Sequence, residues 1–124
     1  MLPNPFLSTD EQAELQLFTE SLERFCDAEI EPHYRAWEKA GRVPRDLLLK
    51  MGENGYLCAD VPDAYGGPGA SVPFSFAVVE VLSRRGYGGF VGGLQVHNDI
   101  IPPYLLHCGT EAQRQYWLPR MASG

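Results

Sequence analysis

Histidine and cysteine are the residue types of this chain best suited to metal binding or nucleophilic catalysis. Their spacing supports neither chemistry, because the sequence contains no HExxH string and no CxxC pair. His107 and Cys108 are neighbours and would diverge around a helix. A Cys–His pair built on Cys58 or Cys108 is left open, although no GxSxG-like elbow accompanies either cysteine. We therefore predict no metal site and no catalytic residue here.

Two glycine-rich stretches invite comparison with nucleotide-binding loops. The stretch over 86–92 (GYGGFVG) does not satisfy GxGxxG, because Val91 takes the place of the third glycine. The stretch over 67–69 (GPG) fails as well, and no strand–helix–strand unit surrounds either one. We therefore predict turns and close helix packing at these glycines, and no cofactor-binding residue.

Composition limits the class of protein. A chain of 124 residues fits one domain, and 44% hydrophobic residues are ordinary for a globular fold. The net charge of -6 argues against a nucleic-acid partner. Three widely spaced cysteines suit a reducing compartment, so we expect a cytoplasmic protein. Neither a signal peptide nor an apolar run of about 18 residues is evident, so we expect no membrane span.

Helix signals begin near the start of the chain. Ser8 and Glu11 form a capping box before an amphipathic stretch over 15–26. Pro32 should end or kink that helix, and its continuation should stop at Gly41.

Prolines and glycines also mark the later helices. Pro44 suits the first position of a second helix, which Gly55 should close. Ser71 can cap a third helix that is apolar nearly all round, so we expect this helix to be central. A further apolar helix over 87–107 should be kinked or restarted at its two prolines.

A last helix completes the predicted fold. Thr110 and Gln113 form a second capping box before it. The fold class is therefore all-α, an orthogonal helical bundle of about five or six helices. The chain stops at Gly124, where a glycine normally leads into the next element, so we expect a cut chain whose residues 1–124 form one domain.

Five strings, read in order, resemble the N-terminal helical domain of acyl-CoA dehydrogenases, with a long-chain-like character. Any one string is weak evidence, whereas five in the right order over nearly the whole chain are specific. The strings are Phe25 to Pro32, Trp37-Glu38-Lys39-x-Gly41-x-Val43-Pro44, Val61-Pro62-x-x-Tyr65-Gly66-Gly67-x-Gly69, Val96-His97-Asn98-Asp99-Ile100, and Gly109-Thr110-Glu111-x-Gln113 with Trp117-Leu118-Pro119-x-Met121-Ala122-Ser123-Gly124.

The resemblance implies a three-domain flavoenzyme that removes the α-proton and β-hydride of an acyl-CoA thioester and passes the hydride to FAD. In that family the catalytic carboxylate and most of the flavin site come from beyond the first domain. We therefore expect residues 1–124 to be a fragment that is inactive alone and does not hold FAD. For the parent protein the resemblance implies acyl-CoA and an electron-transfer acceptor as partners, and a homo-oligomer, either dimer or tetramer.

The acyl-chain pocket is the family site that the resemblance places on this chain. Its lining residues would be Gly92, Gly93, Val96, His97 and Ile100, since an acyl tail needs an apolar slot between helices. The alternative for these residues is helix packing, and for His97 a hydrogen bond within the domain. The two glycines would either deepen the pocket for long acyl tails or allow close helix contact.

Two other functions stay open at this point. One is an independent helical interaction module that shares the fold of the acyl-CoA dehydrogenase domain without its activity. The other is a small enzyme of unrecognised chemistry. A widely exposed apolar face would favour a domain that docks onto others, whereas a module would be polar except for one patch.

Overall fold

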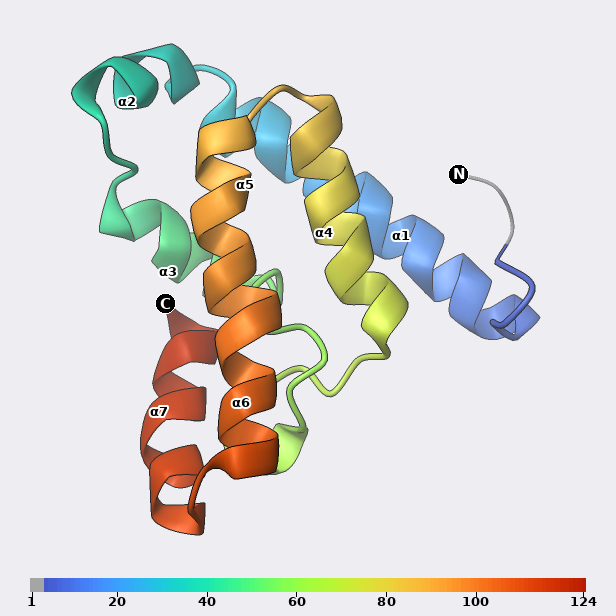
Figure 1. Cartoon of the computed structure of the whole chain (residues 1–124). Helices are drawn as coiled ribbons and strands as arrows, with labels where there is room; N and C mark the ends of the chain where they lie inside the picture. Colours follow the sequence, from blue (N-terminus) through green and yellow to red (C-terminus); the bar gives the residue numbers. More distant parts are fainter. Residues whose placement is uncertain (1–3) are drawn as a thin grey trace.

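The computed structural model describes residues 4–124, and helices joined by turns make up this part of the chain, with no strand in it. Because α5, the π-helical segment η3 (Val96–Ile100) and α6 follow one another without a break, they form one long rod (Figure 1). The predicted all-α fold is confirmed. The α-helices over this range are α1 (Thr9–Phe25), α2 (Tyr34–Ala40), α3 (Arg45–Glu53), α4 (Val72–Arg84), α5 (Gly88–Gln95), α6 (Ile101–Cys108) and α7 (Glu111–Ser123).

None of the helices between residues 4 and 124 is both long enough and apolar enough to cross a membrane.

The predicted start of α1 and the predicted stop of α2 are confirmed. The N–H of Glu11 donates to Ser8 Oγ at 3.2 Å, and the N–H of Ser8 donates to Glu11 Oε2 at 3.0 Å. After α1 the backbone widens into a π-helical turn, η1 (Cys26–Ile30). Pro32 follows, and its missing N–H prevents the helix from continuing. Gly41 ends α2 at a φ of 73°, a left-handed conformation that glycine adopts without strain.

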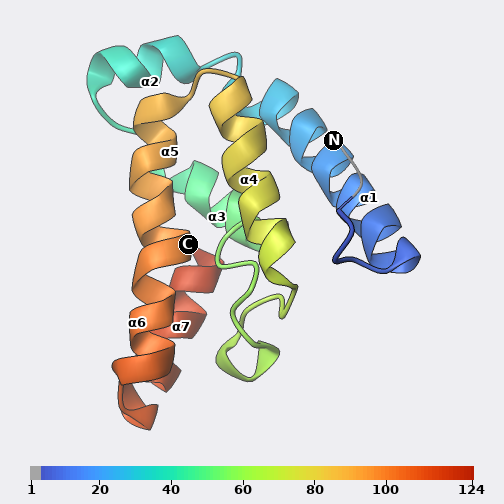
Figure 2. The ribbon, with the colours of Figure 1, turned by 45° about the vertical axis from the view of Figure 1, so that its right-hand side comes forward.

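The main core lies where α1, η1, α3, α4 and α5 meet. Helices α1 and α4 run side by side, and α5 packs against α4 (Figures 1 and 2). Burying one side chain of the size of leucine stabilises a fold by roughly 1.5–3 kcal/mol, so this cluster carries much of the stability. Its buried members include Leu22, Cys26, Ile30, Met51, Leu57, Val81 and Leu82.

A smaller cluster ties α7 to the loop that follows α3. The capping box predicted at Thr110 starts α7, with the N–H of Gln113 donating to Thr110 Oγ1 at 3.2 Å. Helix α7 then packs against both α3 and α6. The rod is thereby held at its α5 end by α4 and at its α6 end by α7. The buried members of this cluster are Cys58, Val61, Leu118 and Ala122.

The restart predicted in the rod is confirmed. Pro102 and Pro103 lie in the first turn of α6, where a missing N–H costs little. Just before them, the N–H of Ile101 donates to the carbonyl of Val96, a π-type bond across five residues. The π-helical segment therefore lets one rod accommodate two prolines without a sharp kink.

Two predicted details are wrong. Helix α3 begins at Arg45, because Pro44 has an extended ψ of 145° and stands before the first turn. Ser71 precedes α4, but its hydroxyl makes no capping bond and is buried with no partner among the described residues. Helix α4 takes the central place predicted for it, since it packs against both α1 and α5, although Phe76 on it is 66% exposed.

Candidate functional site

Three of the five predicted pocket residues form an exposed line along the rod. Gly92, Val96 and Ile100 succeed one another at intervals of four residues, and Val96 and Ile100 are 46% and 47% exposed. Tyr104 continues the line. We call these four residues the rod stripe. A contiguous exposed apolar surface is typical of a site that another surface or a ligand covers.

The adjacent glycines Gly92 and Gly93 face open space. A Cβ built on either residue would meet no heavy atom within 4 Å beyond its chain neighbours and the helix's own backbone. At Gly52, by contrast, a Cβ would lie 2.6 Å from the carbonyl oxygen of Ser123, so that glycine does serve a close approach. The alternative that Gly92 and Gly93 permit close helix contact therefore does not hold among the described residues.

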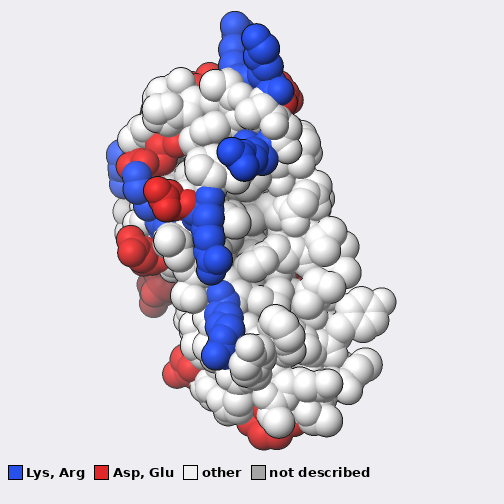
Figure 3. Space-filling model, turned by 90° about the vertical axis from the view of Figure 1, so that its left-hand side faces the viewer, with Lys and Arg blue, Asp and Glu red and all other residues white. Residues whose placement is uncertain are grey.

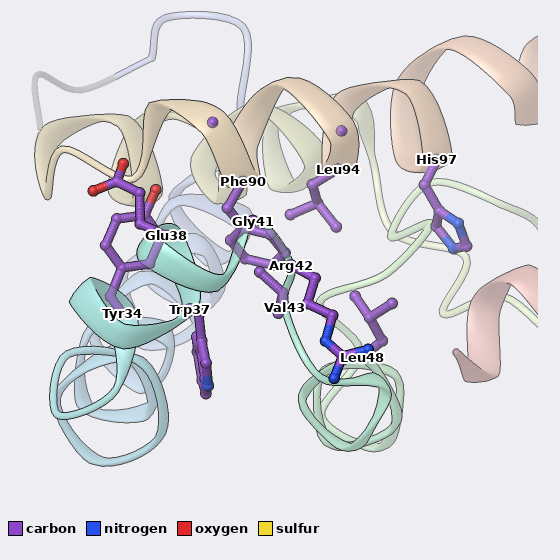
Figure 4. A pocket seen from close by; sticks show the side chains of 12 residues that line it. Tyr34, Trp37, Glu38, Gly41, Arg42, Val43, Leu48, Phe90, Leu94 and His97 are labelled. Atoms are coloured by element: carbon purple, nitrogen blue, oxygen red, sulfur yellow. The ribbon is translucent and has the colours of Figure 1, made fainter.

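A cavity of about 490 Å³ opens on a neighbouring flank of the rod, between α2, α3 and α5 (Figure 4). Gly93 and His97 line it, whereas the rod stripe does not. The two charged residues in its walls are Glu38 and Arg42. The remaining side chains in its walls are apolar or aromatic, namely Tyr34, Trp37, Val43, Leu48, Phe90 and Leu94.

The predicted hydrogen bond of His97 within the domain is confirmed. Its Nε2 lies 2.7 Å from the carbonyl oxygen of Met121. A carbonyl only accepts, so Nε2 carries the proton and, in the neutral ring, Nδ1 is left as an acceptor. His97 therefore joins η3 to α7 and also lines the cavity.

Asn98 is not among the predicted site residues, yet it fastens the loop after α3 to the rod. The side chain is buried, its Oδ1 accepts the N–H of Cys58 at 3.0 Å, and its Nδ2 donates to the carbonyl of Tyr56 at 3.2 Å. Cys58 has a φ of 50°, an uncommon conformation for a residue other than glycine. Because buried amides need partners, an amide within a largely apolar helix was the available signal, although Gln95 in the same helix gives that signal too.

One carboxylate is half-buried on the rod. Burial, helped by the negative charge of Asp60, raises the pKa of Asp99, while a hydrogen bond from Ser75 opposes that shift. Ser75 Oγ also donates to Asp60 Oδ1 at 3.3 Å. Within residues 4–124, no group of three or more His, Cys, Asp or Glu side chains is arranged to hold a metal ion.

The open possibility of a Cys–His nucleophile gains no support at Cys58. Burial raises the pKa of its thiol to about 12, whereas the reactive species would be the thiolate. Its Sγ lies 3.7 Å from the backbone carbonyl oxygen of His97 and 3.9 Å from Asn98 Oδ1, so the acceptors near the thiol are a carbonyl and an amide oxygen and not the imidazole. Cys108 is exposed at the end of α6.

One face of the molecule carries a broad area without charge. Figure 3 shows Lys and Arg side chains in a line down this face, with the uncharged area beside them. Large apolar side chains are exposed on several elements, including Phe76 on α4 and Trp117 on α7 as well as the rod stripe. Apolar exposure spread over several helices favours a domain that docks onto others.

Comparisons with known proteins identify the chain as one domain of a larger family of enzymes. A family model described as acyl-CoA dehydrogenase, N-terminal domain, matches residues 12–124. The mitochondrial long-chain specific acyl-CoA dehydrogenase of Sus scrofa is 35% identical over 113 residues, which make up 90% of this chain and 26% of that protein. The matches give no support to an independent interaction module.

Solved structures share the fold. A crystal structure of an acyl-CoA dehydrogenase from Geobacillus kaustophilus has a TM-score of 0.85 at 38% identity, covering 98% of this chain and 30% of that one. A glutaryl-CoA dehydrogenase from Mycobacterium smegmatis in complex with FADH2 has a TM-score of 0.79 at 24% identity, over 94% of this chain and 29% of that one. The chain thus spans between a quarter and a third of these relatives. Its fold and its sequence together place it in the acyl-CoA dehydrogenase family, as the N-terminal domain.

Proposed function

We propose that this domain supplies one wall of the acyl-chain site in a FAD-dependent acyl-CoA dehydrogenase, with the rod stripe against the acyl tail. The observation that carries the proposal is the exposed apolar line of Gly92, Val96 and Ile100. Gly93 and His97 flank the same wall on the side of the cavity. The proposed reaction of the whole protein is α,β-dehydrogenation of an acyl-CoA thioester, in which bound FAD accepts the hydride.

The described residues do not by themselves fit an FAD site. Their cavity is mainly apolar and its one Lys or Arg is Arg42, whereas a pyrophosphate needs several convergent donors. We therefore assign no flavin contact to this chain. The proposal of FAD for the whole protein rests on the family and on the FADH2 complex of the M. smegmatis relative.

The glycine of the stripe suggests the length of the acyl tail. With no Cβ and no neighbour within 4 Å, Gly92 leaves room where a larger residue would stop a chain. Each methylene buried contributes about 0.8 kcal/mol, so space for a few more carbons separates long from short substrates. We propose a preference for long-chain acyl-CoA.

Kinetics of the complete enzyme test this function. Gly92→Leu is expected to lower kcat/KM for a long-chain acyl-CoA about tenfold, the equivalent of roughly two buried methylenes, and to spare a short-chain one. Ser83→Leu, at an exposed position on α4 and away from the rod, is the control. Equal losses on long and short substrates would remove the acyl-wall proposal.

The chain alone is expected to be inactive. Purified with excess FAD and assayed with acyl-CoA and an artificial acceptor, it should stay colourless and reduce nothing. A yellow, active product would contradict this expectation. An electron-transfer acceptor, a homo-oligomer (dimer or tetramer) and a cytoplasmic location stay predictions for the whole protein.

A further inference from the structure

The cavity between α2, α3 and α5 borders the proposed acyl wall at Gly93 and His97 but includes no residue of the rod stripe. Neither Gly92, Val96 nor Ile100 lines it, and its walls come from this chain. Its volume of about 490 Å³ falls within the range of roughly 300–1,000 Å³ that small-molecule sites occupy. A ligand for it can therefore be sought with this chain as it stands.

The shape and lining of the cavity suit an unbranched apolar chain. In Figure 4 the aromatic and aliphatic side chains follow one another from Tyr34, past Phe90, to Leu48. The wall along α5 is bare backbone at Gly89 and Gly93, where a built Cβ would meet nothing within 4 Å. Apolar walls without side-chain obstruction accept methylene groups and offer them no hydrogen bond.

A cation stands at one end of this apolar lining. In Figure 4 the guanidinium of Arg42 lies beside Leu48, on the side of His97, whereas Glu38 lies at the other end beside Tyr34. Within residues 4–124 the Arg42 side chain forms no ion pair, although several other arginines do. An arginine with its donors free is suited to a carboxylate, which it can bind through two parallel hydrogen bonds.

We propose that this cavity binds a straight-chain fatty carboxylate, with the carboxylate at Arg42 and the alkyl chain along the side chains from Leu48 to Tyr34. The binding needs no thioester, no flavin and no residue of the rod stripe. If decanoate fails to bind in the cavity, the proposal that the rod stripe lines the acyl site is therefore unaffected. If the rod stripe proves not to line the acyl site, the carboxylate proposal is likewise unaffected.

Intrinsic fluorescence measures this binding directly. Trp37 lines the cavity, and Trp117→Phe removes the other tryptophan, which is half exposed on α7. Decanoate should shift Trp37 emission saturably, with an affinity at least about fivefold above that of decanol, and decyltrimethylammonium should bind more weakly still. No saturable effect of decanoate, or equal affinity for all three ligands, would overturn the proposal.

Two pairs of variants separate the contribution of the Arg42 charge to binding from that of the free volume beside Gly93. Arg42→Gln should weaken decanoate about fivefold and leave decanol unchanged, while Arg45→Gln, outside the cavity, should alter neither. Gly93→Leu should abolish binding by filling the cavity, while Gly88→Leu should not. Circular dichroism checks that each variant is folded. Unchanged decanoate binding in either Arg42→Gln or folded Gly93→Leu would refute the assigned site.

Discussion

The imidazole of His97 donates a hydrogen bond of 2.7 Å to the carbonyl of Met121, a residue in the last turn of α7. Carbonyls in the last turn of a helix have no donor within that helix, so a side chain from another element satisfies this one. The bond therefore couples the end of α7 to the π-helical segment that carries the predicted pocket residues.

Replacing His97 by Ala is expected to lower the free energy of unfolding by about 1 kcal/mol, the usual net worth of one intramolecular hydrogen bond. Urea unfolding followed by circular dichroism measures the loss. His107→Ala, at an exposed position on α6, should change stability little. If the two variants are equally stable, the bond to Met121 does not support α7.

Cys58→Gly should be more stable than Cys58→Ala by about 1 kcal/mol. Both changes remove the thiol, but only glycine adopts a φ of 50° without strain. The comparison thus isolates the backbone from the lost side-chain packing. Thermal unfolding measures the difference in stability between the two variants. An alanine variant as stable as the glycine variant would show that the backbone at Cys58 is unstrained.

The turn over 65–69 contains two glycines in the left-handed region, since Gly66 has a φ of 81° and Gly69 a φ of 69°. Gly67 lacks a positive φ, but a Cβ there would collide with the backbone of Val61. Gly66→Val and Gly67→Val should each cost roughly 1–3 kcal/mol. Gly88→Val, which meets open space, is the control, and melting temperatures unaffected by the turn variants would contradict the prediction.

Stability should fall as the pH rises from about 9 toward 12. Burial raises the pKa of the Cys26 thiol from its ordinary 9.0 to about 12. Burial, with the hydrogen bond to Glu31, likewise raises the pKa of Tyr87 from 10.0 to about 12. Each group ionises at lower pH in the unfolded chain, so its contribution is complete below the unfolded value and is lost as the pH approaches the folded value.

Urea unfolding at a series of pH values tests whether the free energy of unfolding falls as the pH rises. Tyr87→Phe should make the decline between pH 10 and 12 shallower, because it removes one of the groups that ionise. A free energy of unfolding that stays level over this window would show that both groups ionise equally easily in the folded and unfolded chain, and a slope unchanged by Tyr87→Phe would show this for Tyr87.

The sequence by itself determined where several helices begin or end. The capping boxes at Ser8 and Thr110 and the left-handed stop at Gly41 are local, because each involves partners within about four residues. The five family strings likewise sufficed to identify the domain, since they depend on order along the chain and not on contacts. The acyl role of the five pocket residues stays a prediction.

Only the tertiary structure decided how those residues divide between surfaces. Gly92 and Gly93 are adjacent in the sequence. The packing of α2 and α3 nevertheless makes Gly93 part of the cavity wall and leaves Gly92 on the exposed rod stripe. The anchor from Asn98 to Cys58 joins residues 40 positions apart, so no local pattern could predict it. Such contacts depend on the direction in which whole helices cross, which is set by the combined packing of the core and not by any short stretch of sequence.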